Sequence, residues 1–446
     1  MVKDMTKGSV IKLLISFAVP MLLGNVFQQL YSAVDTWAVG RGVGVNALAA
    51  VGSTGSLNWM VLGFVTGLTH GFSILISQSF GRKDDDAVRK SVTGSAYLSL
   101  LISVVVSILG VVFARPLLML MNTPADILED ACLYISLIFG GMLTAIFYNL
   151  AASILRALGD SVSPLIIIII SSLVNVGLDL LFVMVFHWGV AGVAVATLIA
   201  QLLSGLLCLL VLRRIPLLKM AKSDWRPEKA VLFELLHLGI PVGLMNSVTA
   251  VGMLILQWIV NGFGAVTVAA YTVVSKLIGF AEQPSNIIGF SLGTFVGQNL
   301  GAGKISRLRE GVKKAALLST GVSLTVGGLL IAFGRQLTGF FVSPEETAVI
   351  ETAYPFLVLV GISLVILGYL FLFRFSLQGM GDTLLPLLSG VLELALRISI
   401  VFLIPLSWGF WRISIAEVSA WAGAAILLGI GYFVRIRKLA PSISRP

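Results

Sequence analysis

The sequence predicts an all-α polytopic membrane protein, with twelve transmembrane helices in two parallel six-helix repeats that form two lobes around a central cavity. Three observations predict this fold. The chain of 446 residues is 57% hydrophobic and only 11% charged, whereas a soluble protein carries about 25% charged residues. Its apolar residues fall into long runs, and the second half of the chain repeats motifs of the first half.

Twelve segments are apolar and long enough to cross a bilayer, which takes about 20 helical residues. They are 13–39, 48–80, 91–114, 132–156, 163–187, 190–212, 233–260, 267–300, 313–334, 350–377, 384–406 and 413–434. Pro20, Pro241 and Pro284 lie inside three of them. We expect each to kink or unwind its helix, because proline lacks the N–H donor. Glycines four residues apart, such as Gly67 and Gly71 in the second span, predict close approach of helix backbones.

The basic residues orient the chain in the membrane. Those outside the cytoplasmic segments are Arg41, Arg115, Arg335 and Arg412 in outer loops and Lys276 and Arg397 within spans. The rest of the 30 Lys and Arg residues, Arg374 among them, fall on the cytoplasmic side if the N-terminus is inside. This bias predicts a multi-pass protein of the cytoplasmic membrane with both termini in the cytoplasm. It also explains the net charge of +9 without a nucleic-acid partner.

The two halves of the chain carry the same motifs at a nearly constant offset. Pro20, Asn25 and Trp37 match Pro241, Asn246 and Trp258, and GDS at 159–161 matches GDT at 381–383. Since each copy holds an even number of spans, both copies enter from the same membrane face and the repeat is parallel. We therefore expect an N-terminal lobe with the cation site at 1–222 and a C-terminal lobe at 223–446.

Several classes of activity are excluded by the motifs. The stretch GQNLGAGK (297–304) ends like a phosphate-binding loop, but Gln298 replaces a required glycine and Ile305 replaces the Ser or Thr. We therefore expect no use of ATP. The three histidines lack zinc-site spacing and no nucleophile–base set is present, so the chain is not expected to be an enzyme or to hold a cofactor. RALGDS (156–161) and QGMGDT (378–383) indicate a helix stop, a tight turn and an N-cap.

Polar residues within three of the spans form a candidate cation site. Asn175 and Asp179 lie on one face of the fifth span because they are four residues apart. Asp35 lies near the outer end of the first span and Thr197 in the sixth, so all four lie roughly 6–18 Å below the outer surface. A bare carboxylate in hydrocarbon costs on the order of 2.5–3.5 kcal/mol, which favours function over packing for such acids. Oxygen ligands suit a small cation, and neighbouring carboxyl groups readily share a proton.

The second lobe does not copy this set. Asp35 aligns with Leu256, and Asn175 and Asp179 align with Arg397 and Val401. Glu393 and Arg397 are four apart and are expected to pair on one helix, and Glu417 is expected to pair with Arg412. The candidates for the substrate cavity are Gln28, Asn246, Lys276, Glu282 and Gln283.

A set of motifs spread over the chain resembles one known family. The set comprises Pro20, Gln28, VDTWAVG (34–40), LAAVG (48–52), SQSFGRKD (77–84), RALGDSVSP (156–164), NVGLD (175–179), GQNLGAGK (297–304) and QGMGDTLLP (378–386). It is similar to the multidrug and toxic compound extrusion (MATE) transporters over essentially the full length. The resemblance implies an N-lobe cation site at Asp35, Asn175, Asp179 and Thr197, which would also bind Na⁺ if Na⁺ is used. Some members carry a glutamate early in helix seven, where this chain has Thr249.

The resemblance implies a secondary antiporter that exports small organic compounds, cationic or amphiphilic, in exchange for H⁺ or Na⁺ by alternating access. We expect it to act as a monomer in the bilayer, with the coupling ion in place of any cofactor. The alternative is a flippase for lipid-linked oligosaccharides or lipids with a similar two-lobe architecture. Such a flippase should line its cavity with cations for a pyrophosphate. The spans here offer Lys276 and Arg397 against Asp35, Asp179, Glu282, Glu393 and Glu417.

Overall fold

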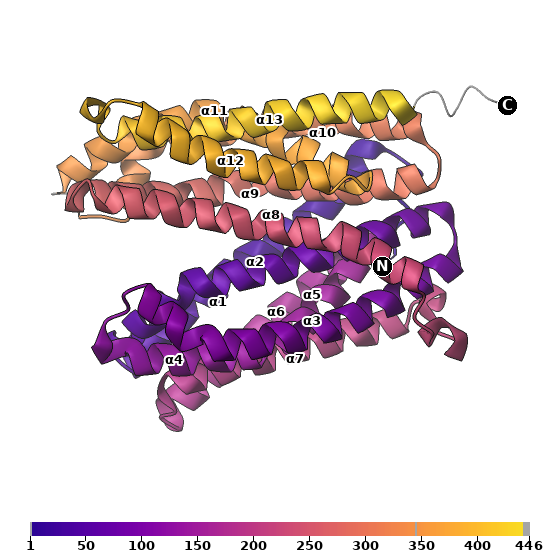
Figure 1. Ribbon diagram of the computed structural model, residues 1–446, viewed down its shortest axis with the longest axis horizontal. Coiled ribbons are helices and arrows are strands. Elements are labelled where there is room, and N and C mark those ends of the chain that lie inside the picture. Colours follow the sequence, from indigo (N-terminus) through magenta and orange to yellow (C-terminus); the bar gives the residue numbers. More distant parts are fainter. Residues whose placement is uncertain (1, 344–345, 440–446) are drawn as a thin grey trace. The chain divides into compact units, whose positions relative to one another are not determined.

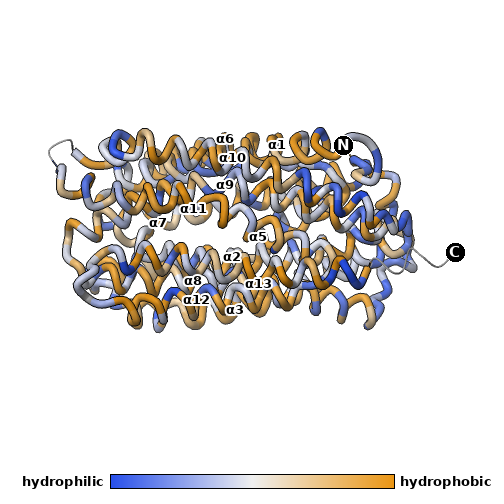
Figure 2. The backbone as a smooth tube through the Cα atoms, turned by 90° about the horizontal axis from the view of Figure 1, so that it is seen from above, coloured by the Kyte–Doolittle hydropathy of each residue, from blue (hydrophilic) through white to orange (hydrophobic). Residues whose placement is uncertain are grey.

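A computed structural model describes residues 2–343 and 346–439, and over these residues the regular structure is entirely helical (Figure 1). The α-helices are α1 (Val10–Gly42), α2 (Val45–Arg82), α3 (Asp85–Leu120), α4 (Ala125–Gly140), α5 (Met142–Ala157), α6 (Val162–Asp179), α7 (Gly189–Arg213), α8 (Lys229–Asn261), α9 (Ala265–Gly301), α10 (Ile305–Gly339), α11 (Thr347–Gly379), α12 (Leu384–Leu403) and α13 (Trp411–Leu439). Eleven helical spans in the described part of the chain are long and apolar enough to cross a membrane. The predicted membrane fold is confirmed, and Figure 2 shows hydrophobic residues along the helices.

The predicted fourth span (132–156) is broken in the structure. Its residues fall in α4 and α5, which meet at Gly141 with a bend of 47°. A β-carbon at Gly141 would lie 2.3 Å from the side chain of Leu198, so the backbone at the bend packs directly against α7. Counting the bent pair as one span gives up to twelve spans in residues 2–343 and 346–439.

The chain forms two compact units. The first comprises residues 1–4 and 19–243, and the second comprises residues 5–18 and 244–446. Residues 5–18 belong to the first repeat but pack in the second unit. Residues 223–243 belong to the second repeat but pack in the first unit. Helices α1 and α8 each contribute to both units, and each passes from one unit to the other near a proline. The boundary in α1 lies at residues 18–19, before Pro20, and the boundary in α8 lies at residues 243–244, after Pro241.

The N-terminal segment is held in the second unit by the stretch that resembles a phosphate-binding loop. The side-chain oxygen of Gln298 accepts a hydrogen bond from the Met5 amide at 2.8 Å. The Asn299 amide donates to the Met5 carbonyl at 3.2 Å, and Lys304 donates to the Thr6 carbonyl at 2.8 Å. The polar residues of GQNLGAGK therefore bind the protein's own main chain.

The linker between the repeats is held in the first unit by α3. It contains two short 3₁₀ helices, Pro216–Leu218 and Lys222–Trp225. Asp224 pairs with Arg89 at 3.1 Å, and its carbonyl accepts a hydrogen bond from Thr93 at 2.8 Å. Tyr97 donates to the Trp225 carbonyl at 2.8 Å. These contacts fix the linker against the end of α3.

Glycine permits the close helix packing that the sequence predicts. A β-carbon at Gly71 in α2 would lie 2.4 Å from the α-carbon of Gly239 in α8. In the second unit, a β-carbon at Gly379 would lie 2.5 Å from the Gly293 carbonyl oxygen. Both distances are shorter than van der Waals contact, so a larger residue would separate the helices.

The two predicted turns have the expected geometry in both repeats. Gly159 and Gly381 have φ values of +83° and +82°, a region that favours glycine. Asp160 then accepts a hydrogen bond from the Ser163 amide at 3.0 Å, and Asp382 accepts one from the equivalent amide at 3.2 Å. These carboxylates cap α6 and α12 and satisfy N–H groups that the helices leave free.

Candidate functional site

The candidate cation site lies where α6 changes its winding. The α-helix ends at Asp179, and a π-helical segment follows at Leu180–Val185. Such wider turns are rare and occur frequently at functional sites. The rings of Phe182 and Trp188 stack 4.8 Å apart just beyond the acid, at the end of this segment. Asp179 is thereby fixed between a regular helix and an aromatic cluster.

The structure brings Asp35, Asn175 and Asp179 together. With its nitrogen turned toward the acids, the Asn175 amide donates hydrogen bonds to Asp179 Oδ2 and Asp35 Oδ1, both at 3.1 Å. The two carboxyl groups also lie within hydrogen-bonding distance of each other. Asn175 and Asp179 are fully buried at 1% and 0% exposure, and Asp35 is half-buried. A hydrogen bond between two carboxyl groups needs a proton on one of them, so a single shared proton would stabilise this arrangement.

Thr197 completes the predicted group from the neighbouring helix α7. It is buried, and its side chain lies close to the hydroxyl of Tyr31. Asp179 Oδ1 is buried without a hydrogen-bond partner among the described residues, and Thr197 Oγ1 is buried with the Tyr31 hydroxyl as its neighbour. A buried carboxylate oxygen without a partner is costly, and it is the type of atom that accepts a proton or a small hard cation.

Two tyrosines that the sequence analysis does not single out also face the acids. Tyr31 precedes Asp35 by one helical turn on α1, and Tyr134 comes from α4. Both lie within electrostatic reach of Asp35 and Asp179. The spacing of Tyr31 and Asp35 is a signal that could have identified the first tyrosine, because residues four apart share a helix face. No sequence signal marks Tyr134.

The second unit contains a buried ionic network in place of an acid pair. Arg397 of α12 donates to Glu417 of α13 through two hydrogen bonds, at 2.9 and 3.0 Å. Glu393 lies 3.5 Å from Arg397 and also pairs with Arg374 of α11. All four residues are at most 6% exposed. Two cations and two anions balance each other, so the network carries no net charge.

This network corrects two expectations from the sequence. Glu417 pairs with Arg397, and the expected pairing with Arg412 is wrong, because Arg412 donates instead to the Val401 carbonyl at 2.9 Å. Arg374 does not belong with the cytoplasmic charges, since it is buried between α11 and α12. The expected contact between Glu393 and Arg397 is present, but each residue also binds a partner on another helix.

The candidates for the substrate cavity lie on three helices. Gln28 is exposed on α1 in the first unit. In the second unit, Asn246 of α8 and Glu282 and Gln283 of α9 are half-buried. Lys276 is exposed and lies over the ring of Phe341 at 5.9 Å, so its ammonium group interacts with the ring face. Their assignment to a cavity stays a prediction.

The sequence model of the MatE family matches this chain twice, at residues 20–181 and 241–403. The two matches cover most of both halves and begin at Pro20 and Pro241, as the internal repeat predicts. The chain belongs to the MatE family. MatE proteins are membrane transporters, which agrees with the two-unit helical fold and with the acids buried inside it.

Curated relatives of this MatE chain match it over nearly its whole length. The probable multidrug resistance protein YoeA of Bacillus subtilis is 27% identical over 97% of this chain and 95% of its own. The multidrug export protein MepA of Staphylococcus saprophyticus is 24% identical over the same shares of both chains. The predicted family is thus confirmed.

Solved structures share the fold. A multidrug resistance MATE family transporter of the MOP superfamily, solved in an outward-facing conformation, superposes with a TM-score of 0.90 at 22% identity, covering 98% of each chain. A MOP superfamily transporter from Pyrococcus furiosus, described with a binding pocket of reverse polarity, gives a TM-score of 0.91 at the same identity and over the same 98% of both chains.

Proposed function

We propose that this protein exports small organic compounds, cationic or amphiphilic in character, in exchange for H⁺ or Na⁺. The names of its relatives as multidrug resistance and multidrug export proteins support the class of substrate. The observation that carries the proposal is the pair of carboxyl groups, Asp35 and Asp179, joined by Asn175 inside membrane helices. We place the coupling ion there, in the first unit.

The acid pair suits a proton well. One proton between Asp35 and Asp179 leaves a single negative charge, which the Asn175 amide stabilises through two hydrogen bonds. Loss of that proton would leave two like charges in contact, and their repulsion would drive the two helices α1 and α6 apart. Proton loading is in this way linked to the packing of the acid-bearing helices.

The same residues also fit Na⁺. Asp179 Oδ1, which has no partner among the described residues, and the buried Thr197 Oγ1 are the oxygens that such an ion would take. The Asn175 amide would then have to turn, so that its oxygen instead of its nitrogen faces the site. H⁺ and Na⁺ therefore require different orientations of the Asn175 amide. The vesicle experiment described below distinguishes the two ions.

Ion loading would drive alternating access by changing the relative stability of two states. A ligand shifts such an equilibrium only by its difference in affinity between the states. A proton or Na⁺ that binds only when Asp35 and Asp179 are close would favour the packed arrangement of α1 and α6. Release of the ion would favour the other state. The free energy of inward ion flow would in this way drive outward movement of the substrate.

Ethidium uptake into everted membrane vesicles tests the proposal, with the pH gradient and the Na⁺ gradient collapsed separately. We expect collapse of one gradient to stop uptake and collapse of the other to leave it unchanged. We further expect Asp35→Asn and Asp179→Asn each to abolish gradient-driven uptake. Glu351→Gln, an acid exposed on α11, is the matched control and should retain uptake. Full uptake in both aspartate variants would refute the site assignment.

A flippase for lipid-linked oligosaccharides is the second candidate, because it shares the two-lobe plan. A pyrophosphate needs unpaired cations. Of the two basic residues expected within spans, Arg397 is neutralised by Glu417 and Glu393. The charges of the described residues therefore favour export of organic cations.

A further inference from the structure

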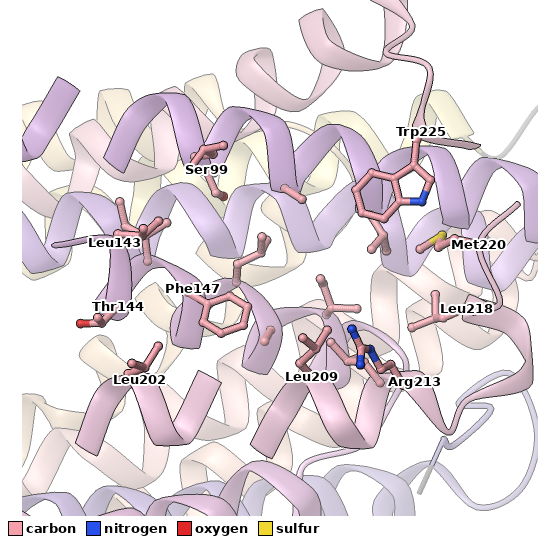
Figure 3. A pocket seen from close by; sticks show the side chains of 18 of the residues that line it. Ser99, Leu143, Thr144, Phe147, Leu202, Leu209, Arg213, Leu218, Met220 and Trp225 are labelled. Atoms are coloured by element: carbon pink, nitrogen blue, oxygen red, sulfur yellow. The ribbon is translucent and has the colours of Figure 1, made fainter. Parts of the chain in front are cut away.

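A groove on the first unit lies between α3, α5 and α7, and neither Asp35 nor Asp179 lines it (Figure 3). Its volume is about 750 Å³, within the roughly 300–1,000 Å³ of small-ligand pockets. Its walls are mostly apolar, as at Leu143, Phe147 and Leu209. The hydroxyls of Ser99 and Thr144 also line it, and the Thr144 hydroxyl already donates to the Gly141 carbonyl and the Gln201 side chain.

The groove has the length of one membrane leaflet. Leu202 and Arg213, near its two ends, are separated by about 16 Å along α7 at the usual helical rise. Half of a bilayer's hydrocarbon core is about 15 Å thick. Leu143 and Leu202 are exposed, so the groove opens sideways to the surrounding lipid. A chain that entered from the bilayer could lie along its full length.

One end of the groove is positively charged. The distribution of Lys and Arg along the chain predicts that this end is cytoplasmic. Arg213 and Lys219 line this end and are both exposed. Neither forms an ion pair with any residue in the described part of the chain. The nearby acids do not neutralise them, since Asp224 pairs with Arg89 and Glu228 pairs with Lys90 at 2.7 Å.

The linker forms the wall of the groove at this end. Leu218 and Met220 line it, and Trp225 lies at its rim with its indole ring half exposed (Figure 3). Trp225 is fixed by its hydrogen bond from Tyr97 and by an edge-on ring contact at 6.2 Å. Tryptophan favours the level of lipid headgroups, so its place agrees with a headgroup beside Arg213.

We propose that this groove binds an anionic glycerophospholipid of the cytoplasmic leaflet. Its phosphate lies between Arg213 and Lys219, and one acyl chain runs along α5 between α3 and α7. Basic pockets between transmembrane helices on the cytoplasmic side recognise anionic headgroups by charge. The bound lipid joins α7 to the linker. The corresponding helices of the second unit, α11 and α13, form a more open groove that ends at Arg437, and the described residues that line it all come from these two helices.

Native mass spectrometry of the full-length protein in detergent micelles tests this proposal, with phosphatidylglycerol or phosphatidylcholine added. We expect retention of phosphatidylglycerol over phosphatidylcholine. The double variant Arg213→Gln/Lys219→Gln should bind phosphatidylglycerol about 30-fold more weakly, from the usual contribution of each basic residue at an anionic lipid surface. The matched control Arg214→Gln/Lys222→Gln removes the same charge from residues outside the groove and should retain the lipid.

A third variant fills the groove without changing its charge. Ala96 lines the α3 wall, and Ala96→Phe should exclude the acyl chain and lower phosphatidylglycerol retention. Each variant is compared only if it elutes as a single species on gel filtration. Equal loss in the control variant, equal retention of phosphatidylcholine, or unchanged retention in Ala96→Phe would overturn the proposal. Displacement of the lipid by inorganic phosphate or by tetraphenylphosphonium would also overturn it, because it would assign the site to a free anion or to a transported cation.

Discussion

Replacing Glu417 by glutamine is expected to destabilise the second unit strongly. Glu417 accepts two hydrogen bonds from Arg397, and both residues are buried. Without that carboxylate, the ion pair left to Arg397 among the described residues is with Glu393 at 3.5 Å, and Glu393 is shared with Arg374. Breaking one partner of a buried pair costs about 3–5 kcal/mol, because the other charge stays buried without compensation. For a unit of this size, such a cost lowers Tm by at least about 6 °C.

The protein offers a control of equal geometry on its surface. Arg335 binds Glu351 through the same two nitrogens, also at 2.9 and 3.0 Å, but both side chains are exposed. Thermal unfolding of purified variants in one detergent should show a large loss for Glu417→Gln and little change for Glu351→Gln. Arg397→Met should cost about as much as Glu417→Gln. The double variant should lose less than the two single variants added together, by roughly 1–3 kcal/mol. Strictly additive losses, or equal losses in Glu417→Gln and Glu351→Gln, would refute the network.

Three further predictions concern the first unit and the turns. Asp160→Ala should cost about 1–2 kcal/mol in thermal unfolding and Asp382→Ala less, because Asp160 is buried and makes more cap bonds. Burial alone would raise the pKa of Asp160, but its hydrogen bonds hold that pKa below the ordinary 3.8. The contribution of Asp160 to the free energy of unfolding is therefore present above pH 3.8 and is lost as pH falls below it. Equal costs of Asp160→Ala above and below pH 3.8 would contradict this. Gly71→Leu should abolish the single gel-filtration peak, whereas Gly55→Leu, where a β-carbon meets nothing within 4 Å, should keep it. Asn175→Leu should weaken the apparent affinity for the coupling ion about 10- to 100-fold in vesicle uptake, because the carboxyl pair loses its donor; unchanged affinity would exclude that role.

The polar pattern of single helices could be predicted from the sequence, as could the depth that Asp35 shares with Asn175 and Asp179, but the rotation of one helix against another could not. Asn175 and Asp179 share a face because of their spacing, and the structure places Asp35 beside them. Spacing along one helix also predicts the contact of Glu393 with Arg397. The partner of Glu417 depends on how α12 and α13 are rotated against each other, which no local pattern specifies.

The burial of a residue near a helix end also could not be predicted from the sequence. Arg374 lies close to the end of α11, so the distribution of basic residues groups it with the cytoplasmic charges, although Glu393 and Ser389 bind it inside the unit. Residues 5–18 pack with the second unit because Gln298 and Asn299 hold their main chain. Such contacts join residues far apart in the sequence, whereas the periodicity of apolar and polar residues predicts only contacts between residues a few positions apart.

Chemical modification of the acid pair by dicyclohexylcarbodiimide tests the central claim most directly. This reagent attacks protonated carboxyl groups in apolar surroundings, and peptide mass spectrometry locates the product. We predict modification at Asp35 or Asp179 in the purified protein, and we predict that it falls either as pH rises or when Na⁺ is added at constant pH. A fall as pH rises with no effect of Na⁺ would identify H⁺ as the coupling ion, and a fall on addition of Na⁺ at constant pH would identify Na⁺. Modification of these aspartates that neither cation changes, or its absence from both at acidic pH, would contradict the account.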